Sequence, residues 1–143
     1  MADIWSTSKR SEVMSHIRSS GNRETELAMI KVFRELGITG WRRGQVLTLT
    51  NNGKPNRIRP DFLLRAERVA VFVDGEFWHG HPTKCRIPQT RRSWWLAKIQ
   101  GNKRRDLLQS RLLRRAGWRV IRVWQSEIGT PACIRKLKKA DLI

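Results

Sequence analysis

The 143-residue sequence carries 30 Lys and Arg against 12 Asp and Glu, which gives a formal net charge of +18. A chain of this length predicts one domain with a real hydrophobic core, and its two cysteines make no disulfide framework. A charge this positive predicts a polyanionic partner, with nucleic acid favoured over an anionic membrane surface. The sequence lacks an apolar run of roughly 18 residues, a signal-peptide core and a lipidation motif. We therefore expect no membrane association and a protein of the cytoplasm, held at the nucleoid by DNA.

Two helices are predicted before residue 37. In the first 20 residues, Val13, Met14 and Ile17 fall on one face of a basic helical segment. Met14 can fill the core or contact bases, and the sequence leaves that choice open. A second helix is predicted to begin after Asn22, a favourable cap, and to end at Gly37. Its apolar face, predicted to pack on a sheet, consists of Met29, Val32, Phe33 and Leu36.

Three strands are predicted next, and their succession favours a β-meander. Residues 41–50 alternate loosely between apolar and polar side chains and end at a turn signal in residues 51–53. Residues 62–64 and 69–73 are apolar runs joined by a tight turn near Ala66 and Glu67. In an antiparallel hairpin of these two runs, the start of the first strand lies beside the end of the second.

A long helix and a fourth strand follow. The helical pattern from residue 90 to Ala116 ends at Gly117, and residues 118–124 have a strong strand pattern. Such a crossover favours a strand that joins the sheet parallel to a neighbour, and residues 131–139 predict a last basic helix. We therefore expect a single α/β domain with a mixed β-sheet flanked by helices. The long helix is expected to face the core with Trp95, Ile99, Leu107, Leu108, Leu112 and Leu113, and to offer phosphates the basic side chains of Arg91, Arg92, Lys98, Lys103, Arg104 and Arg105.

The stretch from residue 59 to residue 81 concentrates groups that can do chemistry. Asp61 and Asp74 fall at the same end of the predicted hairpin, and Glu76, His79 and His81 follow directly. Carboxylates gathered at one point form a hard oxygen site suited to Mg²⁺. A divalent ion there lowers the pKa of a bound water and a neutral histidine takes its proton, so the cluster predicts phosphodiester hydrolysis. The alternative is a surface hairpin whose acids pair with Arg57, Arg59 or Arg65.

Four segments of the sequence carry a family resemblance. They read Arg-Pro-Asp-Phe at 59–62, Phe-Val-Asp-Gly-Glu-Phe-Trp-His-Gly-His at 72–81, Trp-Leu-Ala-Lys-Ile at 95–99 with Asn102 and Asp106 beyond it, and Ala-Gly-Trp-Arg-Val at 116–120 followed by Val123 and Trp124. In these segments, and over most of its length, the chain resembles the very-short-patch repair (Vsr) endonucleases. The resemblance implies a core similar to that of type II restriction enzymes. It also implies a Mg²⁺-dependent nick in one strand of duplex DNA beside a T:G mismatch.

The resemblance assigns catalytic roles by motif position. It implies that Asp61 and the backbone carbonyl of Val73 bind the metal and that His79 activates water. Glu26 resembles a supporting acid on the N-terminal helix. Asp74 stands where the family has histidine, and an aspartate there would itself suit a metal, so we count it among the expected ligands and catalytic residues.

The resemblance also assigns DNA contacts. Phe77 and Trp78 resemble side chains that enter the base stack beside the mismatch, with Met14 opposite them. Arg91, Arg92 and Lys98 are the basic residues expected to hold the backbone. We expect residues 1–20 to form a DNA-contacting helix and residues 22–143 to form the catalytic core.

Two further features depart from the family pattern. The cysteines that hold a structural zinc in the family match Glu76 and Ser126 here, which leaves His81 and Cys85. Two ligands do not close a four-coordinate site, so we expect a fold without structural zinc. Residues 51–56 form an insertion with no counterpart in the family pattern.

Other functions remain open from the sequence. A nuclease with this fold could cut other sites, as homing or mobile-element enzymes do. A catalytically inert DNA-binding module would keep the basic helix and the aromatic pair, and RNA is a third possible partner. The recognition sequence and the number of subunits are left open.

Overall fold

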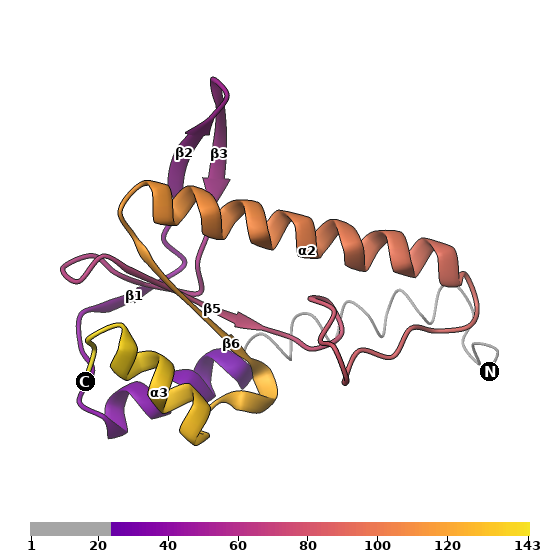
Figure 1. Cartoon of the computed structure of the whole chain (residues 1–143). Coiled ribbons are helices and arrows are strands. Elements are labelled where there is room, and N and C mark those ends of the chain that lie inside the picture. Colours follow the sequence, from indigo (N-terminus) through magenta and orange to yellow (C-terminus); the bar gives the residue numbers. More distant parts are fainter. Residues whose placement is uncertain (1–23) are drawn as a thin grey trace.

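The computed structural model describes residues 24–143, which form a single α/β domain (Figure 1). The predicted helix of residues 1–20, with Met14, lies outside the described residues. The second predicted helix is present as helical residues 24–35. The elements after it are β1 (Trp41–Arg43), β2 (Leu47–Asn51), β3 (Lys54–Ile58), β4 (Phe62–Leu64), β5 (Val69–Asp74), α2 (Arg92–Arg115), β6 (Arg119–Trp124), the 3-10 helix η1 (Gln125–Glu127) and α3 (Pro131–Lys139).

The central sheet has four strands in the order β1-β4-β5-β6. β1 pairs antiparallel with β4, and β4 pairs antiparallel with β5, whereas β6 lies parallel to β5. α2 provides the long crossover that two parallel neighbours require. The predicted mixed sheet flanked by helices is therefore confirmed.

The predicted antiparallel succession of three strands is present as β1, β4 and β5, but the single strand predicted at residues 41–50 is wrong, because these residues belong to two strands in different sheets. The chain turns after β1 at Gly44, whose φ of 66° favours glycine. β2 and β3 then form a separate two-stranded sheet, the β2–β3 ribbon of residues 47–58. Asn52 and Gly53 close this ribbon with φ of 50° and 76°, the left-handed pair typical of a type I′ turn.

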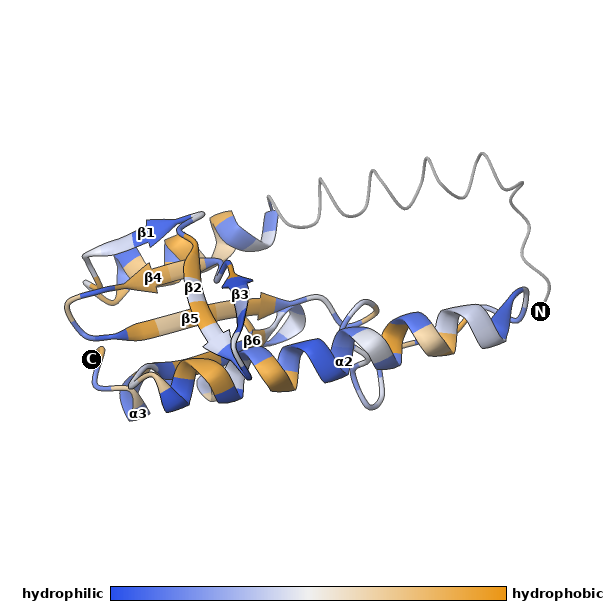
Figure 2. Cartoon of the chain, turned by 90° about the horizontal axis from the view of Figure 1, so that it is seen from above, coloured by the Kyte–Doolittle hydropathy of each residue, from blue (hydrophilic) through white to orange (hydrophobic). Residues whose placement is uncertain are grey.

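Helices cover both faces of the central sheet (Figures 1 and 2). Helical residues 24–35 and α3 pack on one face, and the C-terminal half of α2 packs on the other together with the ribbon. The side chains of β5 show this division, since Val69 and Val71 join the first core while Ala70 and Phe72 join the second. Burial of one such large apolar side chain stabilises the fold by about 1.5–3 kcal/mol.

α2 extends well beyond the end of the sheet (Figure 2), and its inward face differs from the prediction. Leu107, expected in the core, is 73% exposed. Asn102 and Ser110 are buried instead. Their side chains bind polar groups beneath the helix: Asn102 donates to the carbonyl of Trp78 at 2.8 Å, and Ser110 accepts from Nε of Arg122 at 2.8 Å. The inward face is polar midway along α2, so hydrophobicity alone misplaced Leu107.

Candidate active site

Asp61 lies immediately before β4, where β5 ends. Its Oδ2 accepts the backbone N–H of Val73 at 2.7 Å. Burial raises the pKa of the Asp61 carboxyl to about 6 against the lowering effect of that hydrogen bond, and the nearby carboxylates of Glu26 and Asp74 raise it further. The predicted meeting of Asp61 and Asp74 at one end of the hairpin is confirmed, and an added positive charge beside Asp61 would relieve the unfavourable burial.

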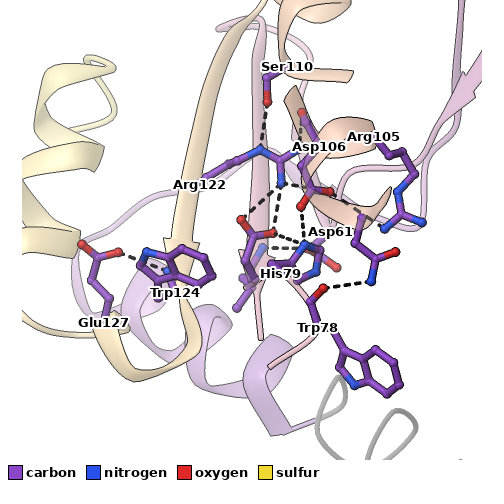
Figure 3. Close-up of polar contacts among 12 residues, drawn as sticks. Asp61, Trp78, His79, Arg105, Asp106, Ser110, Arg122, Trp124 and Glu127 are labelled. Atoms are coloured by element: carbon purple, nitrogen blue, oxygen red, sulfur yellow. Dashed lines mark hydrogen bonds and ion pairs between the residues drawn. The ribbon is translucent and has the colours of Figure 1, made fainter. Parts of the chain in front are cut away.

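Asp74 is the last residue of β5, and its partner is an arginine of β6. Nη1 of Arg122 lies 3.0 Å from Oδ1 and 3.2 Å from Oδ2 of Asp74 (Figure 3). The guanidinium also lies over the ring of Phe72, 4.1 Å from its centroid. Burial raises the pKa of Asp74, although Arg122 opposes that shift. Asp74 is therefore a carboxylate of the site whose negative charge is balanced by the positive charge of Arg122.

His79 lies in the loop after β5, and two carboxylates face its ring. Nδ1 lies 2.5 Å from Oδ2 of Asp106 and 3.7 Å from Oδ1 of Asp74 (Figure 3). An Nδ1–H that bonds a carboxylate fixes the neutral tautomer in which Nε2 keeps its lone pair. His79 is thereby set up to accept a proton at Nε2.

These groups line one cleft of about 310 Å³. Its walls carry both the acids and several arginines, which gives the cleft affinity for a cation and for phosphate at once. Asp74, His79 and Asp106 can each offer a ligand atom within 4.8 Å of the others. The lining consists of Arg57, Arg59, Asp61, Phe72, Val73, Asp74, His79, Arg105, Asp106, Gln109 and Arg122.

Glu26 lies beside this cleft rather than in it. It forms a short ion pair with Arg43 of β1 and shares a neighbouring pocket with Asp61. Its carboxylate is close enough to raise the pKa of Asp61. Glu26 is thus placed to act on Asp61 electrostatically, and Arg43 holds it.

Asp106 and Arg122 are site residues that the sequence reasoning missed. Asp106 is the only acidic residue between Glu76 and Glu127, in a helix rich in arginine and lysine. A single acidic residue in such a basic helix was the feature of the sequence that could have marked Asp106 as a site residue. Arg122 lies among the apolar residues 120–124 of β6, and an arginine facing a sheet's helix layer usually needs an anion.

The aromatic pair after β5 packs against α2. The rings of Phe77 and Trp78 are 5.1 Å apart between centroids, and Phe77 lies 5.5 Å from Trp95. Both side chains of the pair are partly buried. Trp94, next to Trp95, is 48% exposed and lies under the guanidinium of Arg91 at 5.2 Å. An aromatic cluster thus joins the loop to the N-terminal half of α2, where Arg91, Arg92 and Lys98 are exposed.

The positions that the resemblance connects with zinc are linked here by hydrogen bonds, which we call the 76–126 latch. Glu76 Oε1 accepts the backbone N–H of Ser126 at 2.6 Å, and Lys84 Nζ donates to Ser126 Oγ at 2.8 Å. Burial raises the pKa of Glu76, but the hydrogen bonds from Ser126 outweigh it and the net shift is downward. His81 packs its ring on Trp124 at 4.7 Å. The latch ties the loop after β5 to η1.

Comparison with known proteins identifies the family. A family model described as DNA mismatch endonuclease Vsr matches residues 2–85. The chain belongs to the Vsr family. Its relatives include the type II nicking enzyme V.NmeDIP of Neisseria meningitidis serogroup C, 34% identical over 142 residues, which are 96% of this chain and 89% of the relative. The DNA mismatch endonuclease Vsr of Escherichia coli K12 is 35% identical over 126 residues, 87% of this chain and 74% of the relative.

A further relative is the type II nicking enzyme V.NaeI of Lentzea aerocolonigenes, 38% identical over 118 residues, 82% of this chain and 68% of the relative. Membership of the Vsr family confirms the predicted resemblance and the restriction-endonuclease-like fold class. It also confirms that the chain is a DNA endonuclease. Within residues 24–143 of this Vsr-family chain, no helix is both long and apolar enough to cross a membrane.

Proposed function

We propose that this Vsr-family endonuclease nicks one strand of double-stranded DNA in the cytoplasm, in a Mg²⁺-dependent reaction at T:G mismatches. The observation that carries the proposal is the meeting of Asp61, Asp74 and His79 in one cleft whose walls also carry arginines. Hydrolysis of a phosphodiester needs a cation, a base for the attacking water and positive charge around the phosphate. The cleft has residues for each of these needs.

The donor set fits a divalent cation. Asp61 is a partly buried carboxylate whose pKa is raised mainly by its burial, and the carbonyl of Val73 would supply a second hard oxygen. We assign the ion to Asp61 and the Val73 carbonyl, with a remaining lone pair of Asp74 as the third oxygen. Bound there, Mg²⁺ would polarise a phosphoryl oxygen and lower the pKa of a water. Glu26 sustains the negative potential behind Asp61.

His79 acts as the general base in this proposal. Its Nε2 takes a proton from the attacking water while the new bond from oxygen to phosphorus forms and the bond to the leaving sugar oxygen breaks. Asp106 holds Nδ1–H and stabilises the imidazolium that results. Arg122 helps to hold Asp106 in place, since Nη2 of Arg122 donates to the backbone carbonyl of Asp106 at 3.2 Å.

The surface around the cleft supports duplex binding. Arg91, Arg92 and Lys98 are exposed on the N-terminal half of α2 and would bind phosphates. Phe77 and Trp78 lie in the loop between that half of α2 and the catalytic cleft, where an aromatic wedge would open the base stack next to the nick. Unstacking is easiest at a mismatch, which favours T:G over paired DNA.

Nicking of a supercoiled plasmid tests the proposal. With Mg²⁺, the supercoiled form should convert to open circles without linear product, and EDTA should stop the reaction. Oligonucleotide duplexes that differ only in T:G against T:A then test the mismatch, with the nick mapped on each strand. Asp61→Ala should bind duplex as the wild type does and cut nothing.

Each outcome separates the proposal from its competitors. Equal nicking of T:G and T:A duplexes at a defined sequence would identify a site-specific nickase instead. Linear plasmid as the first product would contradict single-strand cutting. Duplex binding without any cleavage in Mg²⁺ would identify the inert DNA-binding module, and preference for RNA would remove DNA as the substrate.

A further inference from the structure

The β2–β3 ribbon stands apart from the central sheet. Figure 1 shows it rising past α2, away from the body of the domain, and Figure 2 shows that β3 is mostly hydrophilic. The ribbon contains residues 51–56, which the sequence led us to expect as an insertion. Its tight turn at Asn52 and Gly53 gives it a narrow tip.

The two faces of the ribbon differ in burial. Leu47, Leu49 and Ile58 point inward and pack with the core beneath α2. The alternate positions face outward: Thr48 pairs with Arg57, Thr50 pairs with Pro55, and all four are exposed. The inner face therefore accounts for the stability of the ribbon, and the outer face is left for another purpose.

Charge identifies the partner that this outer face fits. No acidic residue occurs between Glu35 and Asp61. The same segment contains five basic residues, namely Arg42, Arg43, Lys54, Arg57 and Arg59. Hydroxyl, amide and cationic side chains without a carboxylate suit the phosphates and base edges of a nucleic acid.

The outer face continues directly into the catalytic cleft. Arg57, at the base of the ribbon, lines that cleft together with Arg59 and Asp61. A strand advances about 3.4 Å per residue, so Gly53 lies roughly 14 Å along the ribbon from Arg57. Duplex DNA advances about 3.4 Å for each base pair, so a ribbon laid along the duplex would extend about four base pairs from the cleft that Arg57 lines.

We propose that the outer face of the β2–β3 ribbon enters the major groove of duplex DNA about four base pairs from the nick. The major groove of B-form DNA is about 12 Å wide and admits a two-stranded ribbon, whereas the minor groove, about 6 Å wide, does not. On the outer face, Arg57 contacts a phosphate and Thr48 and Thr50 contact base edges. At the tip, the exposed side chains of Asn52 and Lys54 contact the same duplex. This proposal rests on the proposed function for the position of the cleft but extends it to a sequence-reading element.

A tip variant tests the ribbon without disturbing its fold. The tip variant combines two substitutions. Asn52→Gly removes a polar side chain and keeps the left-handed turn, and Lys54→Ala removes one exposed cation next to it. Lys138→Ala is the matched control, because Lys138 is exposed on α3, on the opposite face of the sheet. Binding is measured by fluorescence anisotropy in EDTA, so that the duplex stays intact, and melting temperatures check that both variants are folded.

The tip variant should bind duplex DNA about 5- to 100-fold more weakly than the wild type, the range of one or two lost groove contacts. Lys138→Ala should change affinity less than the tip variant does. On double-stranded RNA, whose major groove is too deep and narrow for a ribbon, the two variants should lose similar and small amounts. Trimming the duplex to fewer than about four base pairs on one side of the mapped nick should weaken the wild type but not the tip variant.

Equal DNA affinities for the tip variant and Lys138→Ala would overturn the proposal, as would equal losses on DNA and RNA. If the tip variant binds DNA more weakly but the wild type never nicks, the ribbon proposal is supported and the proposed function is contradicted. If the wild type nicks but the tip variant binds DNA like the wild type, the proposed function is supported and the ribbon proposal is contradicted.

Discussion

Replacement of Asp61 by Asn separates two properties of this carboxylate, because the amide oxygen can still accept the Val73 N–H but carries no charge. Burial raises the pKa of Asp61 from its ordinary value of 3.8 to about 6. Between those pH values the native protein binds this proton more tightly than the unfolded chain does. By linkage, ionisation of Asp61 lowers the free energy of unfolding as the pH rises through this window, and the loss persists above it.

The magnitude follows from the same two pKa values. At about 1.4 kcal/mol for each pH unit between them, the ionised carboxylate lowers the free energy of unfolding by about 3 kcal/mol at pH 7 without metal. Asp61→Asn should therefore be more stable than the wild type by about 3 kcal/mol at pH 7 and equal to it near pH 4. In a domain of this size the difference corresponds to roughly 6–12 °C in Tm.

The assay is thermal unfolding of the metal-free proteins at both pH values, repeated with Mg²⁺. The ion should raise the Tm of the wild type by mass action and leave that of Asp61→Asn unchanged, while nicking is lost in the variant. Asp141→Asn is the control, because this carboxylate is exposed and its ion pair with Arg119 contributes little. A variant less stable than the wild type at pH 7, or a stability difference that is the same at both pH values, would refute the reasoning.

Three further outcomes are expected. Asp106→Asn should slow nicking by about 100-fold or more with duplex affinity unchanged, because the His79 tautomer is no longer fixed; an unchanged rate would contradict this. Trp78→Ala should weaken binding to a T:G duplex more than to a paired one, whereas equal losses with a large fall in Tm would show that Trp78 only packs. Metal analysis after purification without added zinc should find no stoichiometric zinc, because Glu76 and Ser126 bond each other; one zinc per chain, lost with the fold on chelation, would prove otherwise.

The elements with strong local patterns were predicted well from the sequence. Residues 131–139 were expected to be a helix and are α3, with Thr130 capping it by accepting the N–H of Cys133. The hairpin of β4 and β5 and the parallel addition of β6 were also predicted. Apolar runs, a cap residue and a crossover of sufficient length each dictate structure over a few neighbouring residues, so no distant partner had to be known.

The elements that depend on distant partners were predicted less well. The residues 41–50 look like one strand, but β1 finds its partner in β4 and β2 finds its own in β3. A positive φ at Gly44 separates them, and glycine in a loosely alternating segment does not reveal by itself that the chain turns there. The prediction that Leu107 is buried was wrong for a similar reason. Polar contacts from the loop after β5 and from β6, rather than hydrophobicity, determine which face of α2 points inward.

The residues of the candidate site also differ in whether they could be predicted from nearby sequence or only from the tertiary fold. Asp61, Asp74 and His79 could be found because they sit within twenty residues of one another around a hairpin. Asp106 and Arg122 come from α2 and β6, and only the tertiary fold brings them to His79 and Asp74. The sequence thus pointed to the groups that we propose as reactive, and the side chains that hold them came only from the structure.

Those missed side chains explain where a cation would be needed. Three carboxylates line the cleft, and two have basic side chains as partners: Asp74 pairs with Arg122, and Asp106 bonds His79. Asp61 forms no ion pair with any residue in 24–143. Its hydrogen bond from the Val73 N–H lowers its pKa, but burial raises the pKa by more. The missing positive charge is therefore at Asp61, which is why we place Mg²⁺ there and regard Asp74 as the weaker ligand, already held by its arginine.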